Sequence, residues 1–368
     1  MIKPKHIVKK VDGDYRLIVI SDIHGHLDRL KLLLKKINYT KNDYLVILGD
    51  FIEKGDQVIE TIHFIQELDK NERTFVLIGN CEWAMEAMLT IPEIARQIPM
   101  YLKRVSSNGC IRTVYHRLYL DDGHETMLGV QRKIAQYLHK ELNYISQLPV
   151  TLKFNDFLFV HAGLEPRNNY KKCGLSSMLE MQRFLDYGHM LDEIVVVGHL
   201  PTSNYRDKIQ NDILYDFQKR IICIDGGTGV KSISQLNALI IEKKDNQIHF
   251  KDEFVQPLKE YLVIEDFKSD QEISHKISYP YFEVEILKKG KAFSYCYQVE
   301  TNTKLYIKNE FLYKRHNKLY CLDDYTDCIL NIKKNHCLKL IGIYGDYVYG
   351  IYEGKVGWTK LSFIEYKK

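Results

Sequence analysis

Six side chains of the kinds that bind metal ions are spread over the first two-thirds of the 368-residue chain. They lie in the short motifs SDIHG, GDFIEKG, GNCE, VHAG and GH, and they are Asp22, His24, Asp50, Asn80, His161 and His199. Carboxylate and imidazole groups suit divalent first-row metal ions, and an amide oxygen can complete such a site. The glycines beside them let the backbone turn sharply and approach an ion closely. The set therefore predicts a metal site.

Each motif follows an apolar run of strand length. The first three runs are Leu17–Ile20, Tyr44–Leu48 and Phe75–Ile78, and the segments between them, Leu27–Ile37 and Val58–Leu68, have the periodicity of helices. This alternation predicts an α/β core with parallel strands, whose carboxyl ends bring ligand-binding loops together. A single motif of this kind is more often a turn or a packed polar residue. Five in order, each after a strand, favour a common site.

Two further regions follow the first three strands. Residues 83–149 carry helical patterns and predict a helical insert. Strand signals then return at Phe157–Val160, Ile194–Val197, Arg220–Ile224, Ala238–Ile241 and Ile248–Phe250. We expect one domain over residues 1–254 and a β-rich region over residues 255–368, where Tyr, Lys and β-branched residues are frequent. Residues 338–368 resemble bacterial SH3-like modules, which implies a small barrel.

The tyrosines near the C-terminus leave two readings open. Tyr344, Tyr347, Tyr349 and Tyr352 are accompanied by lysines, and they can stack on nucleic-acid bases or bind a peptide. They can equally pack across the strands of a small barrel, which we favour for most of them. We also expect that this region can bind a protein partner. Whether the chain binds nucleic acid stays an open question.

Composition and charge restrict the class of protein. The chain is 45% hydrophobic and 27% charged, which is typical of a folded globular protein, and its formal net charge of +4 gives little support for a dedicated nucleic-acid binder. No apolar stretch is long enough to span a bilayer, and the basic N-terminus lacks the apolar segment of a secretory signal. The eight cysteines form no CxxC pair. We therefore expect a cytoplasmic protein with no membrane partner.

The motifs resemble those of the calcineurin-like metallophosphoesterase superfamily. The family pattern reads GDxHG, GDxVDRG, GNHE, H(G/A)G and GH, and weaker matches, such as the one at Ile224–Gly227, extend the likeness over about residues 15–250. The chain is most similar to the bacterial phosphoprotein phosphatase branch, which includes protein Ser/Thr phosphatases and symmetrical diadenosine tetraphosphate hydrolases. The resemblance implies a calcineurin-like α/β/β/α sandwich with a helical insert.

The resemblance also implies how the site works. Asp22, His24 and Asp50 would hold one divalent ion, and Asp50 would bridge to a second ion completed by Asn80, His161 and His199. Mn is the first expectation for both ions, and Fe, Zn or Ni are alternatives. Two such ions polarise a phosphoryl group and activate a bridging water for in-line attack. Arg183 falls where the family places a phosphate-binding arginine, although a solvated helical arginine is an equal reading.

Three positions in the motifs depart from the family in ways that bear on catalysis. Glu53 and Lys54 replace Asp and Arg, and lysine loses the bidentate fork of arginine. Cys81 replaces the histidine that, in the family, protonates the departing oxygen and is oriented by the acid at position 53. A thiol with a pKa of about 8.5 suits that task poorly. The alternative is that another histidine, His26, His124 or His189, supplies the proton.

The leading functional hypothesis is a two-metal phosphoesterase that hydrolyses a phosphodiester or phosphoanhydride in a nucleotide-type small molecule. Such leaving groups are already good acids and depend little on a proton donor. A protein Ser/Thr or Tyr phosphatase, with the C-terminal region recruiting a protein, is the alternative enzyme. A metal- or nucleotide-binding regulatory module with weakened catalysis is the alternative of another class.

Overall fold

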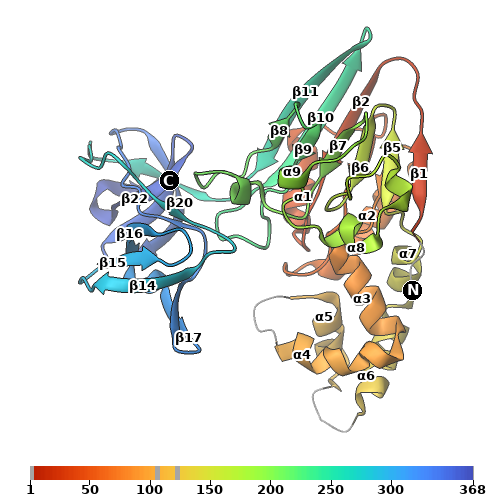
Figure 1. The fold of residues 1–368 in the computed structure, drawn as a ribbon, viewed down its shortest axis with the longest axis horizontal. Coiled ribbons are helices and arrows are strands. Elements are labelled where there is room, and N and C mark those ends of the chain that lie inside the picture. Colours follow the sequence, from red (N-terminus) through yellow and green to blue (C-terminus); the bar gives the residue numbers. More distant parts are fainter. Residues whose placement is uncertain (1–3, 104–107, 121–124, 368) are drawn as a thin grey trace. The chain divides into compact units, whose positions relative to one another are not determined.

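The computed structural model describes residues 4–103, 108–120 and 125–367 (Figure 1). The chain forms two compact units. The first consists of Met1–Thr202, Asp212–Val230 and Gln235–Val255, and the second of Ser203–Asn211, Lys231–Ser234 and Gln256–Lys368. The two short internal segments of the second unit carry no distinguishing sequence signal. Among the described residues, no helix has the length and apolar character needed to cross a membrane.

One sheet of the first unit contains the strands that carry the first three motifs. It consists of β2 (Tyr15–Ile20), β3 (Tyr44–Ile47), β4 (Thr74–Val76), β10 (Leu236–Lys244) and β11 (Gln247–Val255), in the order β11-β10-β2-β3-β4. β2, β3 and β4 are parallel, as the sequence predicts, and β10 is antiparallel to both of its neighbours. β10 and β11 form a hairpin, in which Asp245 and Asn246 have the positive φ angles of a tight turn.

The second sheet faces the first across a shared core. It consists of β1 (His6–Lys9), β5 (Thr151–Phe154), β6 (Phe157–Val160), β7 (Ile194–Val197), β8 (Leu214–Asp216) and β9 (Ile221–Cys223), in the order β1-β5-β6-β7-β9-β8. Side chains of both sheets meet in one hydrophobic cluster, among them Leu17, Val46 and Leu239 from the first sheet and Phe159 and Ile222 from the second. All five are fully buried, so the two sheets form a sandwich.

Helices cover the sandwich and extend one edge of it (Figure 1). α1 (Leu27–Lys36) packs against β10 and β11, and α2 (Val58–Asp69) packs against β4. α8 (Leu175–Glu180) and α9 (Phe184–Tyr187) lie in the connection from β6 to β7. The expected α/β/β/α sandwich is therefore confirmed. The region predicted as an insert contains α3 (Asn80–Thr90), η1 (Pro92–Gln97), α4 (Ile98–Lys103), α5 (Cys110–Arg117), α6 (Met127–Tyr137) and α7 (His139–Ile145).

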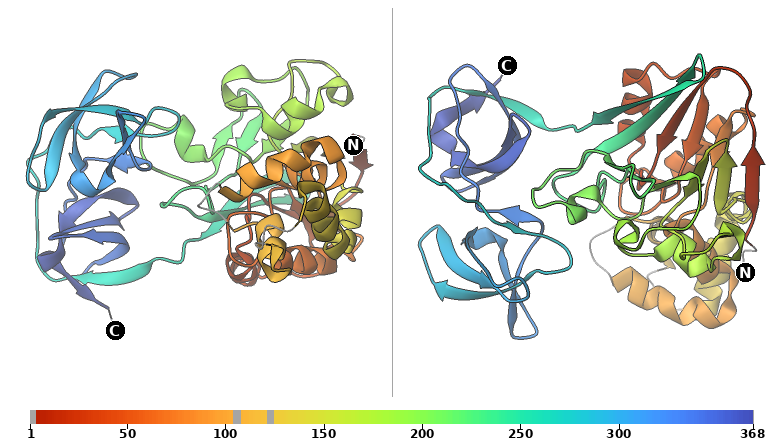
Figure 2. Two further views of the ribbon diagram at one scale, coloured as in Figure 1. Left: turned by 90° about the horizontal axis from the view of Figure 1, so that it is seen from below. Right: turned by 45° about the horizontal axis from the view of Figure 1, so that its top comes forward.

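The second unit is built of antiparallel strands, which confirms the β-rich C-terminal region (Figure 2). One sheet has the order β22-β21-β20-β12-β23, formed by Lys355–Lys360, Tyr347–Tyr352, Cys337–Tyr344, Lys259–Val263 and Ile364–Tyr366. The other has the order β16-β15-β14-β18-β17, formed by Thr303–Lys308, Phe293–Gln298, Glu283–Lys288, Lys318–Cys321 and Leu312–Arg315. β13 (Lys276–Ile277) and β19 (Tyr325–Thr326) form a short pair.

Aromatic packing forms much of the second unit's core. Trp358 is fully buried and stacks on Tyr349 with a centroid distance of 4.5 Å. Tyr349 and Tyr352 are buried in two neighbouring clusters, while Tyr344 and Tyr347 are partly buried and pack against the cluster that contains Tyr349. For Tyr349 and Tyr352 the packing reading is therefore the one the structure supports.

Candidate metal centre

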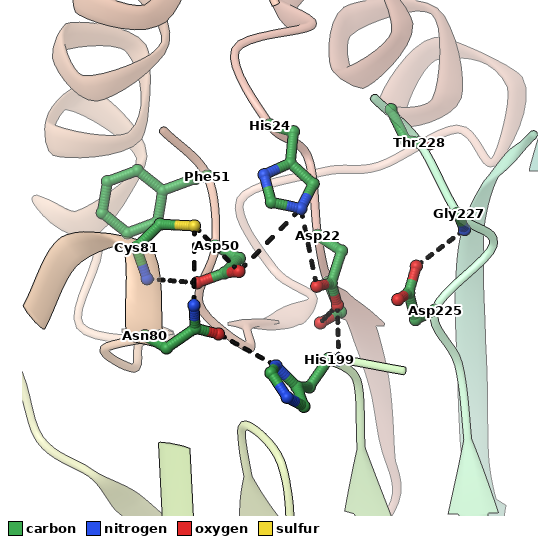
Figure 3. Close-up of polar contacts among 12 residues, drawn as sticks. Asp22, His24, Asp50, Phe51, Asn80, Cys81, His199, Asp225, Gly227 and Thr228 are labelled. Atoms are coloured by element: carbon green, nitrogen blue, oxygen red, sulfur yellow. Dashed lines mark hydrogen bonds and ion pairs between the residues drawn. The ribbon is translucent and has the colours of Figure 1, made fainter. Parts of the chain in front are cut away.

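The loops at the carboxyl ends of five strands bring the six predicted ligand residues together. Figure 3 shows Asp22, His24, Asp50, Asn80 and His199 among them. Two groups have all their ligand atoms within 4.8 Å of one another, His24 with Asp50 and Cys81, and Asp50 with His161 and His199. Asp50 belongs to both groups, as expected of a residue between two ions. The two remaining residues lie beside these groups. Asp22 Oδ1 is 3.9 Å from His24 Nε2, and Asn80 Oδ1 is 2.9 Å from His199 Nδ1.

The backbone at this site adopts a conformation that side-chain-bearing residues usually avoid. Asp22, His24, Asp50 and His199 have φ angles of 53°, 49°, 50° and 65°. Left-handed backbone costs a residue other than glycine roughly 1–2 kcal/mol, and such residues cluster at functional sites. The surrounding fold must stabilise these loops. Close packing contributes to this stabilisation. The Asp50 and Asn80 loops approach so closely that a Cβ atom on Gly49 would lie 2.5 Å from the backbone nitrogen of Gly79.

Backbone carbonyls orient two of the imidazole rings. His24 Nδ1 lies 3.1 Å from the carbonyl oxygen of Ile52, and His161 Nδ1 lies 2.9 Å from that of Leu48. A neutral ring that donates through Nδ1 leaves the lone pair of Nε2 directed at the site. Metal-binding histidines are commonly held in this way. The side-chain amide of Asn80 lies 3.1 Å from His161 Nε2 and 2.9 Å from His199 Nδ1, so it adjoins both rings on the side that faces the site.

Several buried carboxyl groups lie close together at the site, and when ionised they concentrate negative charge there. Burial, together with the neighbouring Asp225 and Asp50, raises the pKa of Asp22 well above its ordinary value. For Asp50, burial opposes ionisation, but His161, His24, the Cys81 backbone N–H and His199 together outweigh it and lower the pKa. Asp225 carries no metal-ligand signal in the sequence analysis, yet it is buried close enough to interact with Asp22. Divalent cations would offset this charge, so the residues present fit a pair of them.

Comparison with known proteins identifies the fold family. Residues 15–221, more than half of the chain, match the sequence profile described as calcineurin-like phosphoesterase. The chain belongs to this family. The family resemblance seen in the motifs is therefore confirmed.

The chain is also similar to several individual proteins. The chain is 25% identical over 179 residues to a symmetrical bis(5'-nucleosyl)-tetraphosphatase of Actinobacillus pleuropneumoniae, covering 48% of this chain and 55% of that protein. A protein of the same name from Vibrio campbellii is 24% identical over 149 residues, covering 40% and 44%. The chain thus spans about half the length of the curated relatives it matches. A solved cold-active protein-tyrosine phosphatase of Shewanella is 18% identical, covering 69% and 83%, with a TM-score of 0.40.

Glu82 positions the Asp50 loop of the metallophosphoesterase domain, a role that the sequence analysis did not assign. One oxygen of its fully buried carboxylate accepts hydrogen bonds from the backbone nitrogens of Gly79 and Asp50, both at 2.9 Å. The other oxygen accepts from Phe51 at 2.9 Å and from Ile52 at 3.1 Å. Four donors from two loops therefore converge on one side chain, which fixes the backbone on either side of Asp50.

Cys81 contacts Asp50 directly. Its backbone nitrogen donates to Asp50 Oδ1 at 2.8 Å, and its Sγ donates to Asp50 Oδ2 at 3.1 Å (Figure 3). Burial and then the charge of Asp50 raise the pKa of the Cys81 thiol in the metal-free chain. The side chain that replaces the family histidine thus lies against the residue expected to bridge the ions.

The helical insert binds Glu53. Tyr101 Oη of α4 donates to Glu53 Oε2 at 2.5 Å, and the backbone nitrogen of Cys110 donates to Oε1 at 3.3 Å. Burial raises the pKa of Glu53. Lys54 is exposed and its backbone pairs with Asn108. These hydrogen bonds of Glu53 thus come from the insert.

Arg183 and its neighbour Gln182 differ in what they contact. Arg183 has a left-handed backbone with φ of 56°, is about half exposed, and donates through Nε to Asp186. Gln182 Nε2 lies 2.9 Å from His199 Nε2, on the ring edge away from Asn80. The sequence analysis singled out Arg183 and missed Gln182, because only the folded chain brings this amide to the imidazole.

The three histidines considered as alternative proton donors occupy different surroundings. Burial, followed by the charge of Arg29, lowers the pKa of His26 to about 4. In His189, Nε2 lies 3.1 Å from the carbonyl oxygen of Arg220, and Nδ1 accepts from the backbone nitrogen of Leu191. Both of its ring nitrogens therefore have structural partners. His124 lies outside the described residues.

Proposed function

We propose that this protein hydrolyses a phosphodiester or phosphoanhydride bond in a nucleotide-type small molecule at a two-metal centre. The observation that carries the proposal is the position of Asp50 between ring nitrogens from three different loops. Its carboxylate lies with His24 in one group and with His161 and His199 in another, and each group could hold an ion. Two divalent cations, when bound, supply charge neutralisation for the phosphoryl oxygens and activation of a water. Mn is the ion we expect first, and Fe, Zn and Ni suit the same donor set.

The chain's own residues would orient this chemistry. Asp50 would contact both ions, with Asp22 and His24 on one side and with Asn80, His161 and His199 on the other. The carbonyls of Ile52 and Leu48 would hold two imidazoles in the required tautomer. Lys54 and Arg183 are the cationic side chains we propose for the phosphate groups, with Lys54 acting as a point charge rather than a fork.

The leaving group decides the proposed substrate class. Cys81 replaces the family's proton donor with a thiol that is hydrogen-bonded to Asp50, and Glu53 is bound by Tyr101. Neither arrangement supports efficient protonation of a strongly basic alkoxide. A nucleoside polyphosphate or an activated diester leaves without that help. The names of the curated relatives, symmetrical bis(5'-nucleosyl)-tetraphosphatases, support a nucleotide as substrate.

A substrate panel tests the proposal. Purified protein with Mn²⁺ would be assayed on bis-nucleoside polyphosphates, cyclic nucleotides, aryl diesters and phosphopeptides. We expect turnover of the anhydrides or diesters, and Asp50→Asn should reduce it by at least about 100-fold. Turnover of phosphopeptides above all other substrates would instead support a protein Ser/Thr or Tyr phosphatase. Metal binding without turnover of any substrate would support the regulatory module.

The leaving-group argument has its own control. Cys81→His restores the family's side chain at this position, so it should raise activity on an alkyl monoester relative to an aryl diester. Equal effects on the two substrates would refute the argument, while the two-metal assignment would stand on the panel and on Asp50→Asn.

A further inference from the structure

We propose that Cys81 is itself a metal ligand, so that one ion of the pair is held by a thiolate as well as by His24 and Asp50. This inference rests on the proposed two-metal function, because it adds a ligand to that centre. The family resemblance does not imply it, since the histidine at this position is a proton donor there. The inference changes the expected metal preference of the site and the role of its sulfur.

The distances fit one ion shared by the three side chains. Cys81 Sγ lies 3.1 Å from Asp50 Oδ2, and His24 Nε2 lies 3.9 Å from the same oxygen. All three ligand atoms lie within 4.8 Å of one another. A tetrahedral ion with bonds of about 2.0–2.3 Å holds neighbouring ligand atoms about 3.5 Å apart. The observed separations bracket that value, so small side-chain movements would complete the site.

The surroundings of this sulfur differ from those of other cysteines in the chain. Hydrogen bonds to backbone carbonyl oxygens are made by the sulfurs of Cys173, Cys296, Cys321 and Cys328. The sulfur of Cys81 instead contacts a carboxylate oxygen. Cys81 is also the second residue of α3, directly after the predicted ligand Asn80. On metal binding the thiol proton would pass to solvent, as in other cysteine-containing metal sites.

A thiolate makes the centre softer than a carboxylate–imidazole site. Soft ligands favour Zn and Fe over Mn, so the parent protein should bind Zn²⁺ more tightly relative to Mn²⁺ than a variant lacking the sulfur. A sulfur bonded to an ion has no proton to donate. Cysteine at position 81 would then have two effects: it removes the family's proton donor, and it adds a sulfur ligand to one ion.

Cobalt substitution tests the assignment directly. Metal-free full-length protein would be titrated with Co²⁺, and the bound metal would be counted by elemental analysis. We expect a near-ultraviolet sulfur-to-cobalt charge-transfer band in the parent, its loss in Cys81→Ser, and its retention in Cys173→Ser, the matched control. In competition titrations, Cys81→Ser should lower the ratio of Zn²⁺ to Mn²⁺ affinity by about tenfold or more.

The outcomes separate the inference from the proposed function. Two bound cobalt ions with no sulfur band would overturn the Cys81 assignment and leave the two-metal centre in place. No bound metal would contradict both. Should Cys81→Ser fail to fold, zinc X-ray absorption of the parent decides the question, because a ligated sulfur scatters at about 2.3 Å. A spectrum with only nitrogen and oxygen scatterers would refute the proposal.

Discussion

Glu82→Gln tests whether one buried carboxylate fixes the Asp50 loop. Each oxygen of Glu82 accepts two backbone N–H groups, and a glutamine keeps only one accepting oxygen. Two of the four N–H donors would therefore face an amide NH2 group in a fully buried environment. Leaving a buried donor unsatisfied costs about 1–3 kcal/mol, so the substitution should weaken the loop by about 2–6 kcal/mol.

Amide hydrogen exchange measures this loss where it occurs. The amides of Asp50, Phe51 and Ile52 are the reporters, since they donate to Glu82. A loss of 2 kcal/mol, the lower end of the range, corresponds to exchange that is about 30-fold faster for amides that exchange by local opening. We also expect metal affinity to fall by about 10–100-fold, because Asp50 would no longer be held in its strained backbone conformation.

Glu86→Gln is the matched control. Glu86 lies one turn further along α3 and is also buried, but its Oε2 has no hydrogen-bond partner among the described residues. The control should therefore leave the exchange of the Asp50 loop unchanged. Equal exchange of that loop in the two variants would refute the reasoning, as would unaltered metal affinity in Glu82→Gln.

Three further substitutions probe other parts of the chain. Gln182→Leu removes the amide beside His199 and should weaken Mn²⁺ binding by about tenfold in calorimetry, whereas an unchanged affinity would show that Gln182 does not orient the ring. Tyr101→Phe removes a hydrogen bond to buried Glu53 and should lower the free energy of unfolding by about 1–3 kcal/mol in urea titrations. Trp358→Ala leaves a cavity in the core of the second unit and should lower its free energy of unfolding by about 3–5 kcal/mol, measured by near-ultraviolet circular dichroism. Hydrolysis of a small aryl ester should persist in this variant, since the proposed ligands all lie in the first unit.

The sequence predicted the central strands and the convergence of the six ligand residues, because both depend on local patterns. Apolar runs such as Leu17–Ile20 are buried on both faces of their sheet, so they show as continuous hydrophobic segments. β1 (His6–Lys9) could not be predicted in this way. Its residues are only partly buried, and its pairing with β5 joins segments more than 140 residues apart.

Partners that meet only through tertiary structure were also beyond the sequence. The resemblance placed Glu53 beside position 81, whereas in the structure Glu53 accepts hydrogen bonds from Tyr101 and Cys110 in the insert. No pattern marks a tyrosine in a helix as the partner of a distant carboxylate. Asp225 was visible as part of a family-like motif, but its approach to Asp22 depends on how the loop after β9 packs.

The cysteine at position 81 explains why the helical insert binds Glu53. A histidine at position 81 would need an acid to orient it, and the acid at position 53 would be free to do so. With cysteine there, Glu53 would be a buried carboxyl group without a ring to bind, and such a group needs other donors. Tyr101 and the backbone of Cys110 supply them, which ties the helical insert to the Asp50 loop. Restoring the histidine alone should therefore recover only part of the monoesterase activity, because Tyr101 would still compete for the acid.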